Sequence, residues 1–408
     1  MSFIIILCFM LSSWPQEQPA PPLTLTLEQA VELASQQNPS LLALAREIEA
    51  ARGQTLVDSA LPEAEVGLEL AGLDFPGARQ VEQEITLGVV QTIPFPGKLR
   101  LRAQAGRLVE AEARLRWQKA RLLLAAEVRK VYFRCLFHQK TVEILLKNLD
   151  LLEEIQKNAM ARYALAAVPY SDILRVRLEI ARTRNDLLAA RNDLKVGWQE
   201  LALLLGLKGE HPLVLTSSLE QPPIDWKLEE WLARKKELSP SLQLARLRQE
   251  QAEVFGQLVL KNRWPNFSLG FFSPSKKLGA TGLSFGLSYP LFSRKRLAGE
   301  KILAEAEKQK ALFASQAAER FYESRSRQAA GSLVQSLEQV RIFEESLLGE
   351  TEAVLEKALS DYRLGRLDSL NLMDLYRQSS LVRLEYYRAL YLYQNALADL
   401  EIAGEDYE

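Results

Sequence analysis

Residues 171–201 read SDILRVRLEIARTRNDLLAARNDLKVGWQEL, and residues 370–400 read LNLMDLYRQSSLVRLEYYRALYLYQNALADL. In both stretches apolar or small residues recur in steps of three and four, the heptad signature of long packed helices. The two seams have the same register, with an offset of 370 − 171 = 199. They comprise Ile173, Val176, Ile180, Thr183, Leu187, Ala190, Leu194, Gly197 and Leu201, and Leu372, Leu375, Ser379, Val382, Tyr386, Ala389, Tyr393, Ala396 and Leu400. The chain is therefore predicted to contain this helix twice.

The rest of the chain divides into two matching halves. Asn38-Pro39-Ser40-Leu41 recurs as Ser239-Pro240-Ser241-Leu242, each time at the start of a helical pattern. An internal repeat determines the architecture of the whole chain. We predict two structural repeats, residues 23–210 and residues 211–408, each with a helix, a strand pair and a long helical hairpin.

The longest predicted helices cover residues 98–162 and 294–361. At 1.5 Å per residue each would reach about 95 Å, which is too long for burial in one globular core. Leucines seven residues apart in the first helix indicate lateral packing against other helices. Taken alone, these helices fit a soluble coiled-coil scaffold as well as a channel.

The first 22 residues have the pattern of a secretory signal peptide followed by a linker. Phe3–Leu11 is apolar, and Pro15–Pro22 is rich in proline and glutamine. Cys8 offers lipidation as an alternative, although Leu7 stands where a lipoprotein has a small residue. Neither this run nor any later segment has the ~20 consecutive apolar residues of a membrane-spanning helix.

Composition and motifs exclude several classes of protein. The chain has 51 Lys+Arg against 52 Asp+Glu, whereas a nucleic-acid-binding protein normally has clustered positive excess. No GxSxG, HExxH, P-loop or CxxC pattern occurs, so we expect neither an enzyme nor a cofactor. His138 and His211 are far apart in sequence, and we predict no metal site.

Four stretches between the helices alternate apolar and small or polar residues, the period of a β-strand. Each approaches the length of a tilted strand that crosses a bilayer, with lipid on one side and water on the other. A half-buried soluble sheet would alternate too. The apolar positions are Val66, Leu68, Leu70, Ile85, Leu87, Val89, Phe267, Leu269, Phe271, Leu283, Phe285, Leu287 and Tyr289.

Four strands cannot close a barrel by themselves, and open sheet edges are not tolerated in lipid. Two chains would give eight strands with a filled interior, whereas three would give twelve with a lumen. Pro94 and Pro290 end the two strand pairs before the long helices, and this recurrence indicates two abrupt strand-helix junctions.

The chain resembles the TolC-like outer-membrane efflux proteins from about Leu23 to Gly404. The matching motifs are Leu25–Ala30 with Asn38-Pro39, the two proline junctions, and the turn Tyr362–Ser369. The resemblance implies a mainly α-helical homotrimer with a periplasmic α-helical barrel and a transmembrane β-barrel of twelve strands in outer-membrane lipid. It also implies a periplasmic adaptor and an inner-membrane pump as partners.

By resemblance, Asp374, Asn371 and Asp172 fall near a periplasmic gate, where a ring of carboxylates would attract cations. The alternative is that Asp374 and Asp172 stabilise the first turns of their helices through the dipole. Asn371 stands where some relatives have a second acid.

The two tight turns, residues 164–171 and 363–370, are expected at the periplasmic mouth. Val168, Pro169, Arg363 and Gly365 are our candidates for the adaptor-docking surface. Gly365 suits the positive φ of a tight turn, whereas the first turn has Ala166 in place of the family's glycine.

The predicted function is an outer-membrane exit duct for small toxic solutes, either metal cations or drugs. The duct of a type I protein secretion system is the alternative, since the same protomer could serve it. A periplasmic coiled-coil scaffold without a pore is the third hypothesis.

Overall fold

The computed structural model describes residues 23–71, 84–207, 213–220, 227–274, 281–289 and 294–406. They form two compact units, each assembled from both halves of the chain. The first unit comprises the described residues of Met1–Pro39, Arg121–Lys227 and Ser326–Ala403, and the second comprises those of Ser40–Ala120, Leu228–Arg325 and Gly404–Glu408. The predicted signal peptide and Pro290 lie outside the described residues.

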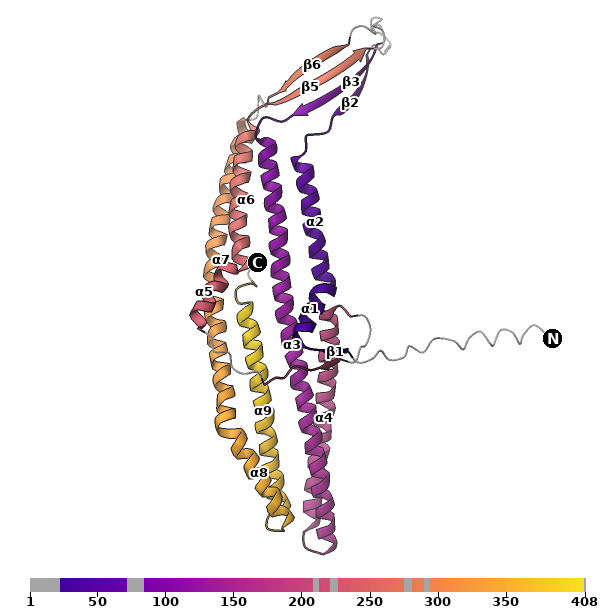
Figure 1. Cartoon of the computed structure of the whole chain (residues 1–408), viewed down its shortest axis with the longest axis vertical. Coiled ribbons are helices and arrows are strands. Elements are labelled where there is room, and N and C mark those ends of the chain that lie inside the picture. Colours follow the sequence, from indigo (N-terminus) through magenta and orange to yellow (C-terminus); the bar gives the residue numbers. More distant parts are fainter. Residues whose placement is uncertain are drawn as a thin grey trace, which may run out of the picture. The chain divides into compact units, whose positions relative to one another are not determined.

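The same order of elements occurs twice along the chain (Figure 1). The bounds of the predicted repeats remain a prediction. The first series is α1 (Leu27–Gln37), α2 (Pro39–Ser59), β2 (Glu65–Ala71), β3 (Glu84–Ile93), α3 (Lys98–Ala164) and α4 (Tyr170–Leu205). The second is α5 (Leu228–Leu238), α6 (Pro240–Asn262), β5 (Asn266–Pro274), β6 (Gly282–Ser288), α7 (Arg294–Ile342), α8 (Leu348–Arg363) and α9 (Ser369–Glu401).

The second long helix is not continuous, which corrects the sequence prediction for residues 294–361. A π-helical turn, Phe343–Leu347, separates α7 from α8, and the ribbon bends there (Figure 1). A π-turn inserts one extra residue per turn and changes the direction of the side chains. Glu344 in this turn accepts a hydrogen bond of 3.1 Å from the Tyr386 hydroxyl of α9.

The predicted heptad seams form the core of the first unit. Every predicted seam residue of α4 is buried. In α9 all are buried except Leu375 and Val382, which are half-buried. Near the tips, Tyr362 of α8 packs with α3, α4 and α9 in a cluster of Leu152, Ile155, Val176, Ile180, Ala358, Tyr362 and Leu372.

Further along α3, the seam requires a glycine. A Cβ at Gly197 of α4 would lie only 2.9 Å from the Cys135 sulfur of α3, so the two helices approach closely there. Cys135 is completely buried, and burial raises the pKa of its thiol to about 12. The thiol is therefore a packing group of the seam.

A parallel pair of short strands in the first unit was not predicted. The strands are β1 (Leu23–Leu25) and β4 (Leu213–Leu215), and they join the starts of the two halves. The buried Tyr132 hydroxyl of α3 donates a hydrogen bond of 2.8 Å to the Leu25 carbonyl. Three-residue strands are too short to show a period in the sequence.

The second unit contains an antiparallel sheet in the order β2-β3-β5-β6. Among the described residues, β2 and β6 each pair on one side only. The register places large apolar side chains on one face, where they are exposed in the single chain. This face carries Val66, Leu68, Ile85, Leu87, Val89, Ile93, Phe267, Leu269, Phe271, Leu283, Phe285 and Leu287.

The opposite face of the sheet is built largely of glycine, serine and threonine. A Cβ at Gly282 would collide with the Phe272 ring, and one at Gly286 would collide with the Ser268 hydroxyl. Small residues are therefore required beside these side chains. The two faces of the sheet thus differ sharply in polarity.

Polar contacts tie the helices of the second unit together. Glu112 of α3 accepts a hydrogen bond of 2.8 Å from Gln251 of α6. Burial opposes ionisation of Glu112, but this bond and the charges of Arg116 and Arg248 outweigh it and lower its pKa. Among the described residues, no helix is both long enough and apolar enough to cross a membrane.

Candidate channel mouth and strand-helix junction

Both tight turns of the first unit end their helices in the same way. After α3, the Ala166 amide donates to the Tyr163 carbonyl and the Ala167 amide to the Arg162 carbonyl, each at 2.9 Å. This pair of bonds is a Schellman motif, which requires a left-handed residue, and Ala166 accordingly has φ 56°.

The turn after α8 repeats this geometry with a glycine. The Gly365 amide donates to the Tyr362 carbonyl at 3.0 Å, and the Arg366 amide donates to the Asp361 carbonyl at 2.8 Å. Gly365 has φ 74° and avoids the strain that the Ala166 side chain causes in the first turn. The two turns therefore match in shape although not in residue type.

The predicted docking residues lie on these turns. Pro169, Arg363 and Gly365 are exposed and Val168 is half-buried. Beside them Leu165 is 81% exposed, so an apolar side chain with no covering lies at the first tip. The two tips also touch, because the Arg162 guanidinium lies 5.4 Å from the Tyr362 ring centroid.

The three predicted gate residues have different partners. The Asp374 carboxylate accepts hydrogen bonds from Arg377 at 2.9 Å and from Gln378 at 3.0 Å. Asn371 belongs to the N-terminal cap of α9, where its amide donates to Asp368 at 2.7 Å. Asp172 is half-buried in the first turn of α4.

A cavity of about 310 Å³ separates the exposed faces of α4 and α9 at this level. It contains Asp374 but neither Asn371 nor Asp172. Three arginines face two carboxylates, which gives the cavity a formal charge of 3 − 2 = +1. Its lining consists of Arg175, Leu178, Glu179, Arg182, Leu370, Met373, Asp374 and Arg377.

Sequence reasoning missed these arginines. The i, i+3 spacing of Asp374 and Arg377 was the available signal, since residues three apart on a helix are neighbours. A gate built here would combine charges of both signs, so a purely acidic ring would form only where Arg377 moves away from Asp374.

The strand-helix junction of the second unit is held by polar and aromatic contacts. Pro94 is buried, and the Phe95 ring stacks on Trp264 with centroids 5.1 Å apart. Lys98 is 4% exposed, and its ammonium donates to the Trp264 carbonyl at 2.7 Å and to Asn266 Oδ1 at 2.8 Å. Lys98 thereby joins the start of α3 to the start of β5.

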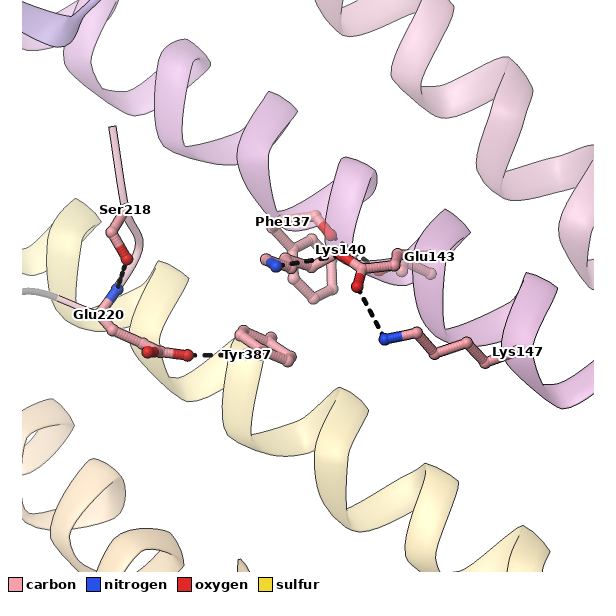
Figure 2. Close-up of polar contacts among 8 residues, drawn as sticks. Phe137, Lys140, Glu143, Lys147, Ser218, Glu220 and Tyr387 are labelled. Carbon is pink, nitrogen blue, oxygen red and sulfur yellow. Dashed lines mark hydrogen bonds and ion pairs between the residues drawn. The ribbon is translucent and has the colours of Figure 1, made fainter. Parts of the chain in front are cut away.

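A further polar network connects α3, α9 and the segment after β4. Figure 2 shows Lys140 beside Tyr387, with the ammonium 5.8 Å from the ring centroid. The Tyr387 hydroxyl donates to Glu220 at 3.3 Å, and Glu143 accepts from Lys140 and Lys147. Burial and the Glu220 charge raise the pKa of Tyr387. The network fastens the connecting segment to the helices.

His138 lies in this part of α3 and is packed against Phe137, with ring centroids 5.3 Å apart. Burial lowers its pKa and favours the neutral imidazole. Among the described residues, no group of three or more histidines, cysteines or carboxylates is placed to hold a metal ion.

Solved channel structures share this architecture. CusC, whose structures concern transmembrane channel formation, has a TM-score of 0.76 and 17% identity over 95% of this chain and 94% of its own. The Campylobacter jejuni CmeC outer membrane channel has 0.78 and 16%, over 94% and 86%. The open Neisseria gonorrhoeae MtrE outer membrane channel has 0.78 and 18%, over 93% and 88%.

At these identities the likeness establishes the fold, which is that of the outer-membrane channels. The family model described as "Outer membrane efflux protein" matches residues 30–207. This match covers the first half of the chain, and it confirms the resemblance to the outer-membrane efflux proteins predicted from the sequence. No curated protein matches the chain. The predicted outer-membrane localisation agrees with the family description.

Proposed function

We propose that this chain is the protomer of a homotrimeric outer-membrane channel, which forms the passive exit duct of a tripartite efflux system. The observation that carries the proposal is the sheet of the second unit. It has two unpaired edges among the described residues and one exposed apolar face. Both features need burial, the edges by further strands and the face by lipid.

Three copies satisfy both needs. Edge β6 of one copy would pair with β2 of the next, which gives a closed barrel of twelve strands with its apolar face toward lipid. The small residues of the other face would line the lumen. Below the barrel, the long helices of three copies would enclose the periplasmic part of the duct.

The partners proposed are a periplasmic adaptor and an inner-membrane pump, because a duct of this kind has no energy source of its own. The exposed turns around Gly365 and Pro169 are the proposed adaptor contacts. The cargo class is small toxic solutes, metal cations or drugs. Asp374 and Arg377 are the proposed charged pair at the mouth, and no catalytic step is part of this function.

Cysteine cross-linking of the two sheet edges tests the proposal. Gly67 of β2 and Ser284 of β6 would be changed to cysteine together, in membranes that contain the full chain. We expect oxidation to give a ladder that ends at the trimer. Each variant with only one of the two substitutions serves as the control and should stay monomeric on a denaturing gel. A double variant that forms no ladder in any register, tested by moving the β2 cysteine to Glu65 and Glu69, would refute closure by these edges.

A further inference from the structure

A basic cavity lies at the foot of the sheet in the second unit, between the start of α3 and the end of α6. This junction cavity has a volume of about 640 Å³. Its described lining contains three cationic side chains, one tryptophan and no carboxylate. The lining residues are Gly97, Arg100, Leu101, Gln104, Gln257, Leu260, Lys261, Arg263 and Trp264.

Among the residues that the structure describes, no ion pair neutralises the positive charges of the cavity. The Lys261 ammonium lies 5.8 Å from the Phe95 ring centroid, and the Arg263 guanidinium lies 5.3 Å from that of Trp264. An aromatic ring attracts a cation but leaves its charge in place. Lys98, which does not line the cavity itself, adds a fourth positive charge next to it. Both oxygens that accept its hydrogen bonds are neutral, so they do not cancel this charge.

The position of the cavity matches a membrane-water interface. Strand β3 ends at Ile93 and strand β5 begins at Asn266, so the lining residues directly adjoin the strands proposed to cross the bilayer. Trp264 is 42% exposed at this level. Tryptophan with nearby lysine and arginine is characteristic of the headgroup region, where the ring lies among lipids and the cations meet phosphates.

We propose that the junction cavity binds the phosphate headgroup of an anionic phospholipid in the adjoining membrane leaflet. The inference rests on the proposed function, because it needs the sheet to lie in a bilayer. Arg100 and Arg263 supply planar guanidinium groups that suit phosphate oxygens, and Lys261 supplies a point charge. The volume is that of a small-molecule site, which a glycerophosphate headgroup fills better than a lone phosphate ion.

Native mass spectrometry of the full chain in detergent tests the proposal. The protein would be titrated with phosphatidylglycerol and, separately, with phosphatidylcholine of the same acyl chains. We expect tighter binding of phosphatidylglycerol. In the double variant Lys261→Gln/Arg263→Gln the affinity for phosphatidylglycerol should fall about 30-fold, because each lost charge weakens binding about fivefold. Binding of phosphatidylcholine should change little.

Three comparisons make the result decisive. Lys308→Gln/Lys357→Gln removes two exposed charges outside the cavity and should keep the preference, as should the charge-conserving Lys261→Arg/Arg263→Lys. If the double variant unfolds, Arg100→Gln alone should still weaken phosphatidylglycerol binding about fivefold. An equal affinity of wild type for both lipids, or an equal loss in the lysine control, would overturn the site.

Two further results separate the alternatives. Displacement of the lipid by inorganic phosphate at equal concentration would assign the cavity to a free anion and overturn the headgroup. Conductance of the same wild-type sample in a planar bilayer separates a failure of the lipid site from a failure of the proposed channel function. A conducting protein without lipid preference would refute the lipid site alone, whereas a protein that forms no pore would refute the proposed function.

Discussion

Removal of Arg377 should make the mouth of the channel more selective for cations. In the structure the Asp374 carboxylate is paired with the Arg377 guanidinium at 2.9 Å, and both groups are more than half exposed. The pair acts on a passing ion as a small dipole. Arg377→Gln would remove one positive charge per chain, and therefore three in the proposed trimer, which takes the formal charge of each mouth cavity from +1 to 0.

The size of the effect follows from Coulomb's law in water. The loss of one positive charge about 7 Å away stabilises a monovalent cation by about 0.6 kcal/mol, and the loss of three by about 1.8 kcal/mol. That corresponds to a local cation concentration about 20-fold higher. Screening reduces it at high salt, so we expect the cation-to-anion permeability ratio to rise about tenfold at about 0.01 M salt and much less at 1 M.

The assay is the reversal potential in a planar bilayer under a KCl gradient. Asp374→Asn should shift the ratio in the opposite direction, and the double variant Asp374→Asn/Arg377→Gln should return close to wild type. Glu385 and Arg388 form the same i, i+3 pair three turns along α9, with a distance of 3.6 Å. Arg388→Gln is therefore the matched control. Reversal potentials unchanged in both single variants would refute a role for this pair at the narrowest point.

Three further predictions concern stability and reactivity, measured in detergent. Ala166→Gly should stabilise the chain by about 1 kcal/mol in denaturant unfolding, and Gly365→Ala should destabilise it similarly, because both positions have positive φ. Gly331 of α7 has no positive φ and has space for a Cβ, so Gly331→Ala is the control, and an equal destabilisation there would contradict this reasoning. Cys135 should resist maleimide at pH 8 until the protein is denatured, and rapid labelling of the folded protein would be inconsistent with its burial. The lowered pKa of Glu112 contributes stability that is present above the ordinary carboxyl pKa of 4.5 and is lost as the pH falls. Glu112→Gln should therefore flatten the acid side of the thermal-stability profile, and an unchanged profile would exclude this contribution.

The heptad seams were predictable because packing of long helices imposes a strict spacing. Ile173 through Leu201 and most of their counterparts in α9 are buried as predicted. The strand pairs were predictable for the same reason, since one face of the sheet is apolar and the other is small or polar. Both patterns repeat at a fixed spacing over many residues, so they can be recognised in the sequence alone.

Other features depend on contacts that leave no local pattern. The π-turn at Phe343–Leu347 contains neither proline nor glycine, the usual marks of an irregular helix. In the sequence Lys98 resembles a surface residue in the first turn of a helix. In the structure it is buried, and it donates hydrogen bonds to oxygens of Trp264 and Asn266, which are 166 and 168 residues away. The arginines of the mouth cavity come from two helices, and only the fold brings them together. The gate and docking assignments remain predictions.

The most direct test of the central claim is the single-channel conductance of the purified protein in a planar bilayer. The wild type should be compared with Asp374→Ser/Arg377→Ser, in which the charged pair at the mouth is removed. We predict discrete conductance steps in both proteins, with larger steps in the variant. If neither protein conducts although each is folded and inserted in the membrane, the chain is not an exit duct.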